Sequence, residues 1–466
     1  MTRMLRADHL VVGAGAMGMA FTDALIDHSD AHVVMIDRRH GVGGHWLEAY
    51  PFVRLHRASA FYGVPSTLMG GGKLQETGPE AGLQERATQS EITAYYARML
   101  DRMVTSGRVE FFANCDYVGD RTFVSRISGE RFEVPSSCRI VNAHHLAPSI
   151  PAEKPAPFGI GDGARVLPVN DLARLREAPS QYVVTGSGKT ATDACIWLLA
   201  RGVDPGAICW VRPRDPWMMN RAKVQPDPAI FLSMAADVMQ AGASAASPED
   251  FFLRLEEADV MLRIDRSVMP TMAKAPTLAT RELEQLRTLE NVVRRGHLES
   301  VERGKLVFAD GAIEIADDAL VVHCAADGLK YPGLVPVWRH EDITLQPIRA
   351  GFPCPGAAVI GYVEATRTDD EEKNRLAAPS PYPRHDGVPG TDERHRHPFG
   401  DDLLGRAGHQ GVGRRGRAQP VTHPGGVCRD AGPRRRALAA RYPHEARAGT
   451  ACRAGGRLTQ ARCLPL

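Results

Sequence analysis

Buried strands and helices alternate along most of the chain. Residues 10–12 and 32–36 are continuous apolar runs, typical of strands that are covered on both faces of a parallel sheet. Between them, residues 17–25 follow the helical period. The same order of strand, helix and strand recurs later, at residues 182–185, 191–200 and 207–211. The pattern predicts an α/β fold with two Rossmann-like units, each of three layers.

Further elements complete these units. The residues TQSE at 88–91 form a capping box that begins a helix of about fifteen residues. Alternating runs at 123–134 and 301–310 predict hairpins, and residues 227–292 follow the helical period. The apolar run 357–361 predicts a late strand that returns to the first sheet and completes it.

The sequence GAGAMG, which begins at Gly13, separates the first strand from the first helix. Gly13 allows a tight turn, Gly15 lets the backbone approach a pyrophosphate, and Gly18 lets the helix pack closely on its strand. Phosphates would bind to free N–H groups at the positive end of the helix, around Ala16 and Met17. This context predicts a dinucleotide site. The alternative is a glycine-rich turn of another α/β domain.

An acidic residue ends the second strand. Asp37 lies about 20 residues after the glycines, where a carboxylate can bind the ribose hydroxyls of an adenine dinucleotide, and Arg38 follows it. The next sequence, GVGGHW, predicts a loop that passes close to a flat ring system and then covers it with an aromatic side chain. We assign Gly44, His45 and Trp46 to cofactor binding. A plain surface turn with a core tryptophan is the alternative.

A second glycine turn follows a proline-rich linker. Gly186 and Gly188 stand two residues apart between a strand and a helix, and alanine takes the place of the third glycine, as NADP-binding fingerprints tolerate. Ser187, Lys189 and Thr190 complete this turn. The residues GKT resemble the end of a P-loop, but that motif needs a glycine five residues before Gly188, where valine stands. An ATPase is therefore excluded.

A basic residue ends the strand after this turn. Arg212 stands where the first unit has Asp37. A guanidinium binds phosphate through two parallel hydrogen bonds, whereas a carboxylate repels it. We therefore expect the second site to prefer NADP(H), through its 2′-phosphate. The alternative is that Arg212 only caps the sheet in solvent.

Bulk composition narrows the class of protein. The 466 residues carry a formal net charge of +2, and no apolar stretch approaches the roughly 20 residues that cross a bilayer. Neither a nucleic-acid nor a membrane partner is expected. Nine cysteines are scattered without a C-x-x-C pair or zinc spacing, so we expect buried free thiols in a reducing cytoplasm and no metal.

Together these residues resemble the flavin-containing monooxygenase-like oxidoreductases, which are class B flavoproteins. The resemblance spans about residues 6–380 and is carried by the turns GAGAMG and GSGKTATD, the loop GGHW, Asp37 and Arg212. It implies that the first unit binds FAD, that GGHW lies near the flavin, and that the second unit binds NADPH. In that family the reduced flavin reacts with dioxygen and oxygenates a small organic substrate.

The sequence departs from the family pattern at two kinds of place. Class B enzymes carry a histidine in a signature between their domains, but the residues FGIGDGAR at 158–165 contain none. Late strands of such enzymes end in Ala-Thr-Gly turns, which here read AHH at 143–145 and AAD at 325–327. These departures concern the oxygenation chemistry more than the cofactor sites.

The resemblance divides the chain into four regions. Residues 1–150 form the first part of an FAD-binding domain, and residues 151–310 form an inserted NADP(H)-binding domain that includes the helical segment. Residues 311–380 return to the FAD-binding domain, and residues 381–466 form a tail.

The tail differs in composition from the rest of the chain. It has sixteen arginines against seven acidic residues and no lysine. One interpretation is a disordered basic segment that binds nucleic acid or anionic lipid. The favoured interpretation is translation out of frame from GC-rich DNA. The other two reading frames of the gene distinguish them, because only a frameshift would leave an apolar helical pattern there.

The sequence thus predicts a cytoplasmic, FAD-dependent, NADP(H)-using oxidoreductase, monooxygenase-like, that acts on a small organic molecule and on dioxygen. An inactivated or non-catalytic flavoprotein-like nucleotide-binding module is the alternative. A plain NAD(P) dehydrogenase without flavin is disfavoured by the two fingerprints. Cofactors carry the chemistry in such enzymes, so the sequence assigns no catalytic residue. It assigns no oligomeric state either.

Overall fold

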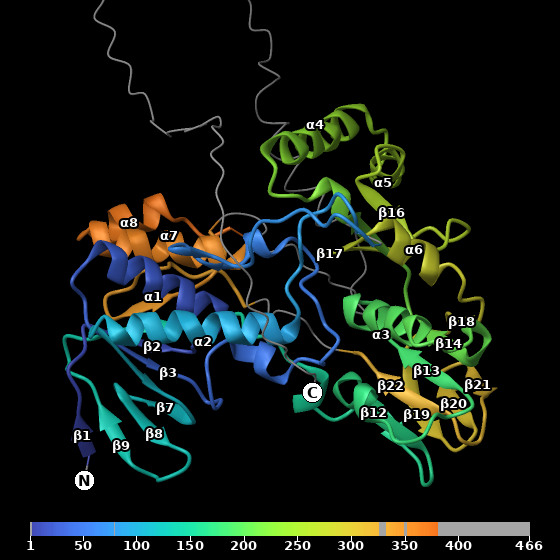
Figure 1. Cartoon of the computed structure of the whole chain (residues 1–466), viewed down its shortest axis with the longest axis horizontal. Helices are drawn as coiled ribbons and strands as arrows, with labels where there is room; N and C mark the ends of the chain where they lie inside the picture. The colour runs from blue at the N-terminus through green and yellow to red at the C-terminus, as the bar shows by residue number, and fades with distance from the viewer. Residues whose placement is uncertain (1, 79, 326–331, 349–351, 381–466) are drawn as a thin grey trace, which may run out of the picture. The chain divides into compact units, whose positions relative to one another are not determined.

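Two parallel sheets organise the chain (Figure 1). The computed structural model describes residues 2–78, 80–325, 332–348 and 352–380, so the predicted tail at 381–466 lies outside the described residues. Each sheet has five strands, and all neighbouring strands within it are parallel. The predicted α/β fold with two Rossmann-like units is confirmed.

The first sheet places a late strand beside four early ones, in the order β23-β10-β2-β3-β6. The pairing of β2 and β3 runs from His9–Val33 to Val12–Ile36, so both strands end at the same edge. The first glycine turn and Asp37 follow directly at that edge. The five strands are β2 (His9–Val12), β3 (Val33–Ile36), β6 (Val109–Phe112), β10 (Arg139–Asn142) and β23 (Asp342–Thr344).

Side chains of the first sheet alternate between two cores. Val11 and Met35 pack with the helices α1 (Ala16–His28), α2 (Gln89–Thr105) and α7 (Pro353–Thr366). Leu10 and Val34 pack on the opposite face with a smaller sheet. Because both faces are covered, these strands have continuous apolar sequences. The smaller sheet consists of β1 (Thr2–Met4), β7 (Cys115–Gly119), β8 (Thr122–Ser125) and β9 (Arg131–Glu133), of which β8 and β9 are the expected hairpin.

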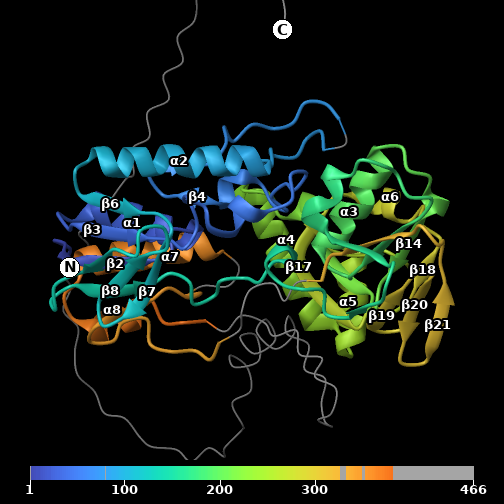
Figure 2. The ribbon, with the colours of Figure 1, turned by 90° about the horizontal axis from the view of Figure 1, so that it is seen from below.

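The second sheet is built in the same way, in the order β12-β22-β13-β14-β18. One face packs with α3 (Lys189–Ala200) and α6 (Thr280–Leu286), which lie next to each other (Figure 2), and the other face packs with a mainly antiparallel sheet. The main strands are β12 (Arg165–Pro168), β13 (Tyr182–Thr185), β14 (Ile208–Val211), β18 (Val292–Val293) and β22 (Leu320–His323). The covering strands are β11 (Gly159–Ile160), β19 (Leu298–Glu302), β20 (Lys305–Phe308) and β21 (Gly311–Glu314), and β19 with β20 is the second expected hairpin.

The segment 227–292 is only partly helical. It contains α4 (Pro228–Ser244), α5 (Pro248–Glu257) and α6, but also β16 (Met261–Arg263) and β17 (Met272–Leu278). Both strands pair with β15 (Pro216–Asn220). The run MAKAPTL of β17 carries lysine and proline and has no clear strand period, so the pairing with β15 defines it. A short ribbon, β4 (Gly63–Val64) with β5 (Thr67–Leu68), completes the described strands.

The predicted strand at 357–361 is wrong. These residues lie within α7, which packs side by side with α1 (Figure 1). A Cβ on Gly361 would overlap the carbonyl oxygen of Phe21, so the glycine lets the two helix backbones approach. A helix with small and apolar residues on such a contact face has the same continuous apolar sequence as a buried strand. The late strand that does complete the first sheet is β23.

A buried cluster of charges fixes α7 and α8 (Asp370–Leu376) to the first sheet. Glu364 on α7 accepts hydrogen bonds of 2.7–3.3 Å from four side chains, those of His9, Arg139, Trp338 and Lys373. Burial opposes ionisation of Glu364. The bonds from His9 and Lys373 and the charge of Arg139 outweigh it and hold the pKa of this carboxyl well below its usual value.

Replacing Glu364 by glutamine should destabilise the protein by about 3 kcal/mol at neutral pH, because buried cations lose their carboxylate. Since folding lowers the pKa of Glu364, its stabilisation is complete above the ordinary value of 4.5 and is lost as the pH falls below it. The difference in free energy of unfolding between wild type and variant, measured in urea, should therefore shrink towards about pH 3. The exposed Glu371 provides the control, and Glu371→Gln should change stability by less than about 0.5 kcal/mol. A pH-independent difference would contradict the account.

Candidate functional site

The first glycine turn joins β2 to α1 at the carboxyl edge of the first sheet. Gly13 has a φ of +108°, a conformation that favours glycine, and its amide donates to the carbonyl oxygen at the end of β3 over 2.9 Å. Gly18 lies where the helix touches the turn, and a Cβ there would overlap the Gly13 carbonyl oxygen. Ala16 and Met17 form the start of α1. The turn thus tolerates no side chain at its closest contact.

The loop after β3 folds back over this turn. The amide of Gly43 donates to the backbone of the turn over 2.9 Å. Gly44 lies so close that a Cβ on it would be 3.0 Å from the Cα of Gly15. His45 and Trp46 follow in a short 3₁₀ helix, and Trp46 packs against the cores of both units. Burial lowers the pKa of His45 to about 4, so its ring is uncharged at neutral pH.

The Asp37 carboxylate holds the first turn in place. Asp37 is buried; its Oδ2 accepts from the Ala14 amide over 2.8 Å, and its Oδ1 accepts from the Arg39 amide over 2.9 Å. A carboxylate has about four acceptor positions, so both oxygens can accept further hydrogen bonds.

A basic cavity lies around the residues that follow Asp37. Arg38 lines it and pairs with Glu153 of the linker at 3.0 Å. The cavity has a volume of about 420 Å³, and its lining consists of Arg38, Arg39, His40, Glu48, Asn114, Arg126 and Glu153. Arginine, amide and carboxylate groups together can bind the polar parts of a nucleotide.

The second glycine turn joins β13 to α3 in the same way. Gly186 has a φ of +131°, and its amide donates over 2.9 Å to the carbonyl oxygen at the end of β14. A Cβ on Gly188 would have no atom within 4 Å, so no side chain of the described residues blocks this position. The hydroxyl oxygen of Ser187 accepts from the Arg214 amide over 3.4 Å.

Both helices that follow the glycine turns begin without a side-chain cap. Among the described residues, no side chain accepts a hydrogen bond as the N-cap of α1 or of α3, whose first residues include Lys189 and Thr190. By contrast, Thr88, Asp227, Ser247 and Asp369 cap α2, α4, α5 and α8. The helices α6 and α7 also begin without a side-chain cap, but their N-cap residues are Ala279 and Phe352 rather than glycine. Uncapped N–H groups at the positive end of a helix can bind an anion. Each turn therefore has donors available for a diphosphate.

Arg212 is buried, so the alternative that it caps the sheet in solvent does not hold. Its side chain is 1% exposed, its Nη2 pairs with Asp215 at 2.7 Å, and its guanidinium lies 4.6 Å from the ring centre of Trp210. Its Nε and Nη1 are buried and have no hydrogen-bond partner among the described residues. These two donors are unpaired but enclosed, so a ligand could reach them only if neighbouring side chains moved aside.

Six charged side chains, three of them buried and three partly exposed, meet beside the second turn. Lys189 pairs with Asp193 and lies 3.7 Å from Glu282. Burial opposes ionisation of Glu282, but Lys189, Arg221 and Arg86 outweigh it and lower its pKa to about 2. Three cations thus balance three anions. Four of the six could not be assigned from the sequence, because they lie in segments without a motif: Glu80, Arg86, Arg221 and Glu282.

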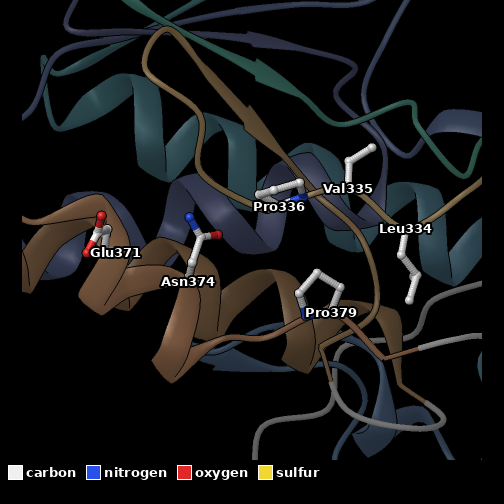
Figure 3. A pocket seen from close by; sticks show the side chains of 6 residues that line it. All are labelled: Leu334, Val335, Pro336, Glu371, Asn374 and Pro379. Carbon is white, nitrogen blue, oxygen red and sulfur yellow. The ribbon is translucent and has the colours of Figure 1, made fainter.

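Another cavity lies apart from the predicted site residues (Figure 3). It has a volume of about 500 Å³ and lies between the segment before β23 and α8. The side-chain amide of Asn374 is already bonded to the backbone of Trp338, at 2.9 and 3.1 Å. The lining is formed by Leu334, Val335, Pro336, Glu371, Asn374 and Pro379, none of which the sequence assigns to a cofactor.

The described residues contain neither a metal-binding cluster nor a helix that could span a membrane. No group of three or more histidine, cysteine, aspartate or glutamate residues is arranged to hold a metal ion. No helix combines the length and the apolar character that crossing a bilayer requires. The described cysteines are all buried and carry free thiols; they are Cys115, Cys138, Cys195, Cys209, Cys324 and Cys354.

Comparison with known proteins identifies the first unit. A family model described as an NAD(P)-binding Rossmann-like domain matches residues 11–59, which contain the first turn and the GGHW loop. The uncharacterized protein Rv2000 of Mycobacterium tuberculosis is 41% identical over 385 residues, which cover 82% of this chain and 71% of that protein. The uncharacterized protein Mb2023 of Mycobacterium bovis matches with the same values.

Solved structures of flavin monooxygenases are also similar to this chain. The open crystal structure of cyclohexanone monooxygenase has a TM-score of 0.49 and 16% identity, covering 77% of this chain and 88% of that one. Oxidized steroid monooxygenase bound to NADP has a TM-score of 0.41 and 15% identity, covering 70% of this chain and 72% of that one.

The glycine contacts give a matched pair of substitutions. Gly18→Ala should lower the free energy of unfolding by about 2 kcal/mol or more, because its methyl group would overlap a backbone oxygen that cannot rotate away. Gly188→Ala places the same methyl group in open space and should change stability by less than about 1 kcal/mol. Chemical denaturation of both variants checks this. Equal losses would show that the turns are not packed as described.

Proposed function

The chain belongs to the same family as Rv2000 and Mb2023, and from this premise and the geometry of its two glycine turns we propose that it is an FAD-dependent, NADP(H)-using oxidoreductase. The first turn, with Gly15 and Asp37, would hold FAD, and the second, with Gly188, would hold NADP(H). The substrate would be a small organic molecule, and the resemblance of the motifs to class B flavoproteins favours dioxygen as the second substrate. The buried free thiols accord with a reducing cytoplasm.

The proposal depends on one observation, the presence in a single chain of two strand–turn–helix junctions that have a glycine N-cap and no capping side chain. A Cβ on Gly188 would meet no atom within 4 Å, and a Cβ on Gly15 would meet only backbone atoms of Gly44. Both turns therefore leave their glycine faces clear of side chains. A dehydrogenase that uses one nicotinamide cofactor needs one such junction, whereas electron transfer between two dinucleotides needs two.

Residues of the chain would position the cofactors. When bound, NADP(H) and FAD supply hydride transfer and the subsequent reduction of a second molecule. The amides at the starts of α1 and α3 would hold the diphosphates, and Asp37 would accept from ribose hydroxyls with its remaining acceptor positions. Trp46 and the uncharged His45 would cover the ring system from one side and exclude water.

Recognition of the 2′-phosphate is proposed for Arg212. Its Nε and Nη1 are buried donors without a partner, and leaving such donors unsatisfied is costly. A phosphate could accept from both once the side chains that enclose them move aside, whereas a carboxylate side chain at this position would repel it. Arg214 is the second candidate, because its amide is bonded to Ser187 of the turn.

A non-catalytic, flavoprotein-like module is the second candidate function. It is favoured by the absence of a histidine from the residues FGIGDGAR and by the state of Lys189, which is already paired with Asp193. A diphosphate at the second turn would compete with this pair. In such a module the turns would still bind nucleotides, but no turnover would follow.

The visible spectrum of the purified protein tests these functions. The proposed oxidoreductase should show flavin absorption that bleaches when NADPH is added under anaerobic conditions, because hydride reaches the flavin. Flavin colour that NADPH does not bleach would support the non-catalytic module. A colourless protein that nevertheless oxidises NADPH would indicate a dehydrogenase and would overturn the FAD assignment.

The cofactor preference tests the phosphate assignment. Arg212→Ala should weaken NADPH binding at least about tenfold, through the loss of charged hydrogen bonds, while NADH binding changes little. Calorimetric titration of both nucleotides into the wild type, Arg212→Ala and Arg214→Ala measures this. If Arg212→Ala weakens the binding of NADPH and NADH equally, Arg212 does not bind the 2′-phosphate. If only Arg214→Ala weakens NADPH binding selectively, the assignment moves to Arg214.

A further inference from the structure

We propose that Tyr50 and Asp193 couple the two glycine turns, so that a dinucleotide bound at the second turn tightens the loop that covers the first. The inference rests on the proposed function and deepens it. It gives Tyr50 a positioning role, because this side chain lies between the turns and would act on the cofactors through other residues.

One short segment is anchored to both turns. At its start, Gly44 lies against Gly15 in the first turn. Six residues later, Tyr50 is buried in the core of the second unit. Its ring packs with Phe52 at 4.8 Å between centres, and Phe52 stacks on Trp197 of α3 at 4.7 Å. Residues 44–53 therefore connect the covering loop of the first site to the helix of the second.

A hydrogen bond ties this segment to the helix. The Tyr50 hydroxyl donates to Oδ2 of Asp193 over 2.8 Å, and the Thr190 side chain interacts with the same hydroxyl. Burial and the charge of Asp193 raise the pKa of Tyr50 well above its usual value, so this hydroxyl remains a donor throughout the physiological range. The other carboxylate oxygen of Asp193, Oδ1, accepts from Lys189.

The position of Lys189 determines whether a ligand at the second turn strengthens or weakens the hold on residues 44–53. Lys189 is the first residue of α3 and follows Gly188, where a diphosphate would bind. The anion would attract the Lys189 ammonium and weaken its pair with Asp193. The Asp193 side chain is only 12% exposed, so water cannot fully replace the lost cation. Its charge would then depend more on the nearby Arg86 and on the Tyr50 hydroxyl, and the stronger bond from Tyr50 would hold residues 44–53 more firmly.

The coupling should be positive and reciprocal. A second-turn ligand that orders residues 44–53 lowers the cost of placing FAD under the Gly44 loop. By linkage, FAD must then tighten the second-turn ligand by the same factor. A change in one charge-assisted hydrogen bond corresponds to a factor of about five in affinity.

Tyr50→Phe removes the hydroxyl and keeps the ring that packs on Phe52. In the full-length wild type, saturating NADP⁺ should tighten FAD binding about fivefold, measured by fluorescence titration. In Tyr50→Phe, the two FAD affinities should agree within about 1.5-fold. Asp193→Asn should also lose the effect, because it removes the charge that responds to Lys189. Tyr182→Phe, a buried site in the same core, is the control and should retain the full factor.

Hydrogen exchange of the backbone amides in residues 44–50 supplies a readout independent of activity. Saturating NADP⁺ should slow this exchange in the wild type and in Tyr182→Phe but not in Tyr50→Phe, while calorimetry shows that NADP⁺ binds all three. If NADP⁺ binds the wild type but changes neither exchange nor FAD affinity, the coupling is wrong and the proposed function stands. If Tyr50→Phe keeps the full effect, Tyr50 is not the link. If NADP⁺ does not bind the wild type, both proposals fail.

Discussion

The close approach of two backbone segments, at Gly15 and at Gly44, is the constraint on which the first site depends. Parallel strands in register bring their carboxyl ends to one edge, so the turn after β2 and the loop after β3 must share the same small space. A side chain on Gly44 would press against the Cα of Gly15, at 3.0 Å, and Gly44 also has a φ of +62°, so the loop needs glycine there. Asp37 fixes the arrangement by accepting from the amides of Ala14 and Arg39. A flat cofactor can lie beside such a surface because only backbone atoms form it.

Features encoded within a few residues could be predicted from the sequence. Both glycine turns, the strands that end at them and the capping box at Thr88 depend on local spacing, and the structure contains all of them. The strand predicted at 357–361 was wrong because the structure of this segment depends on a distant contact. Val359, Ile360 and Gly361 are poor helix formers, and their helix is stabilised by packing on α1, a contact that joins segments more than 300 residues apart.

The residues of the candidate site also fall into two groups, those with a local signature in the sequence and those without one. Its glycines have signatures in the sequence, whereas the burial of Arg212 depends on Asp215 and on the Trp210 ring, which no spacing rule connects. The charge cluster beside Lys189 is assembled from four separate segments, and each of its side chains resembles an ordinary surface charge when the sequence is considered alone. Only folding shows that these charges are largely removed from water and balance one another.

The position of β23 has a consequence for synthesis on the ribosome. Every strand of the second sheet has been made once His323 emerges, but the first sheet still lacks the strand at Asp342–Thr344 and the helix that ends at Thr366. The inserted unit can therefore fold while the outer unit is still open at one edge. Until β23 has been synthesised and has paired with β10, one edge of β10 exposes unpaired backbone groups. Nascent chains are therefore most prone to wrong strand pairing before β23 is in place.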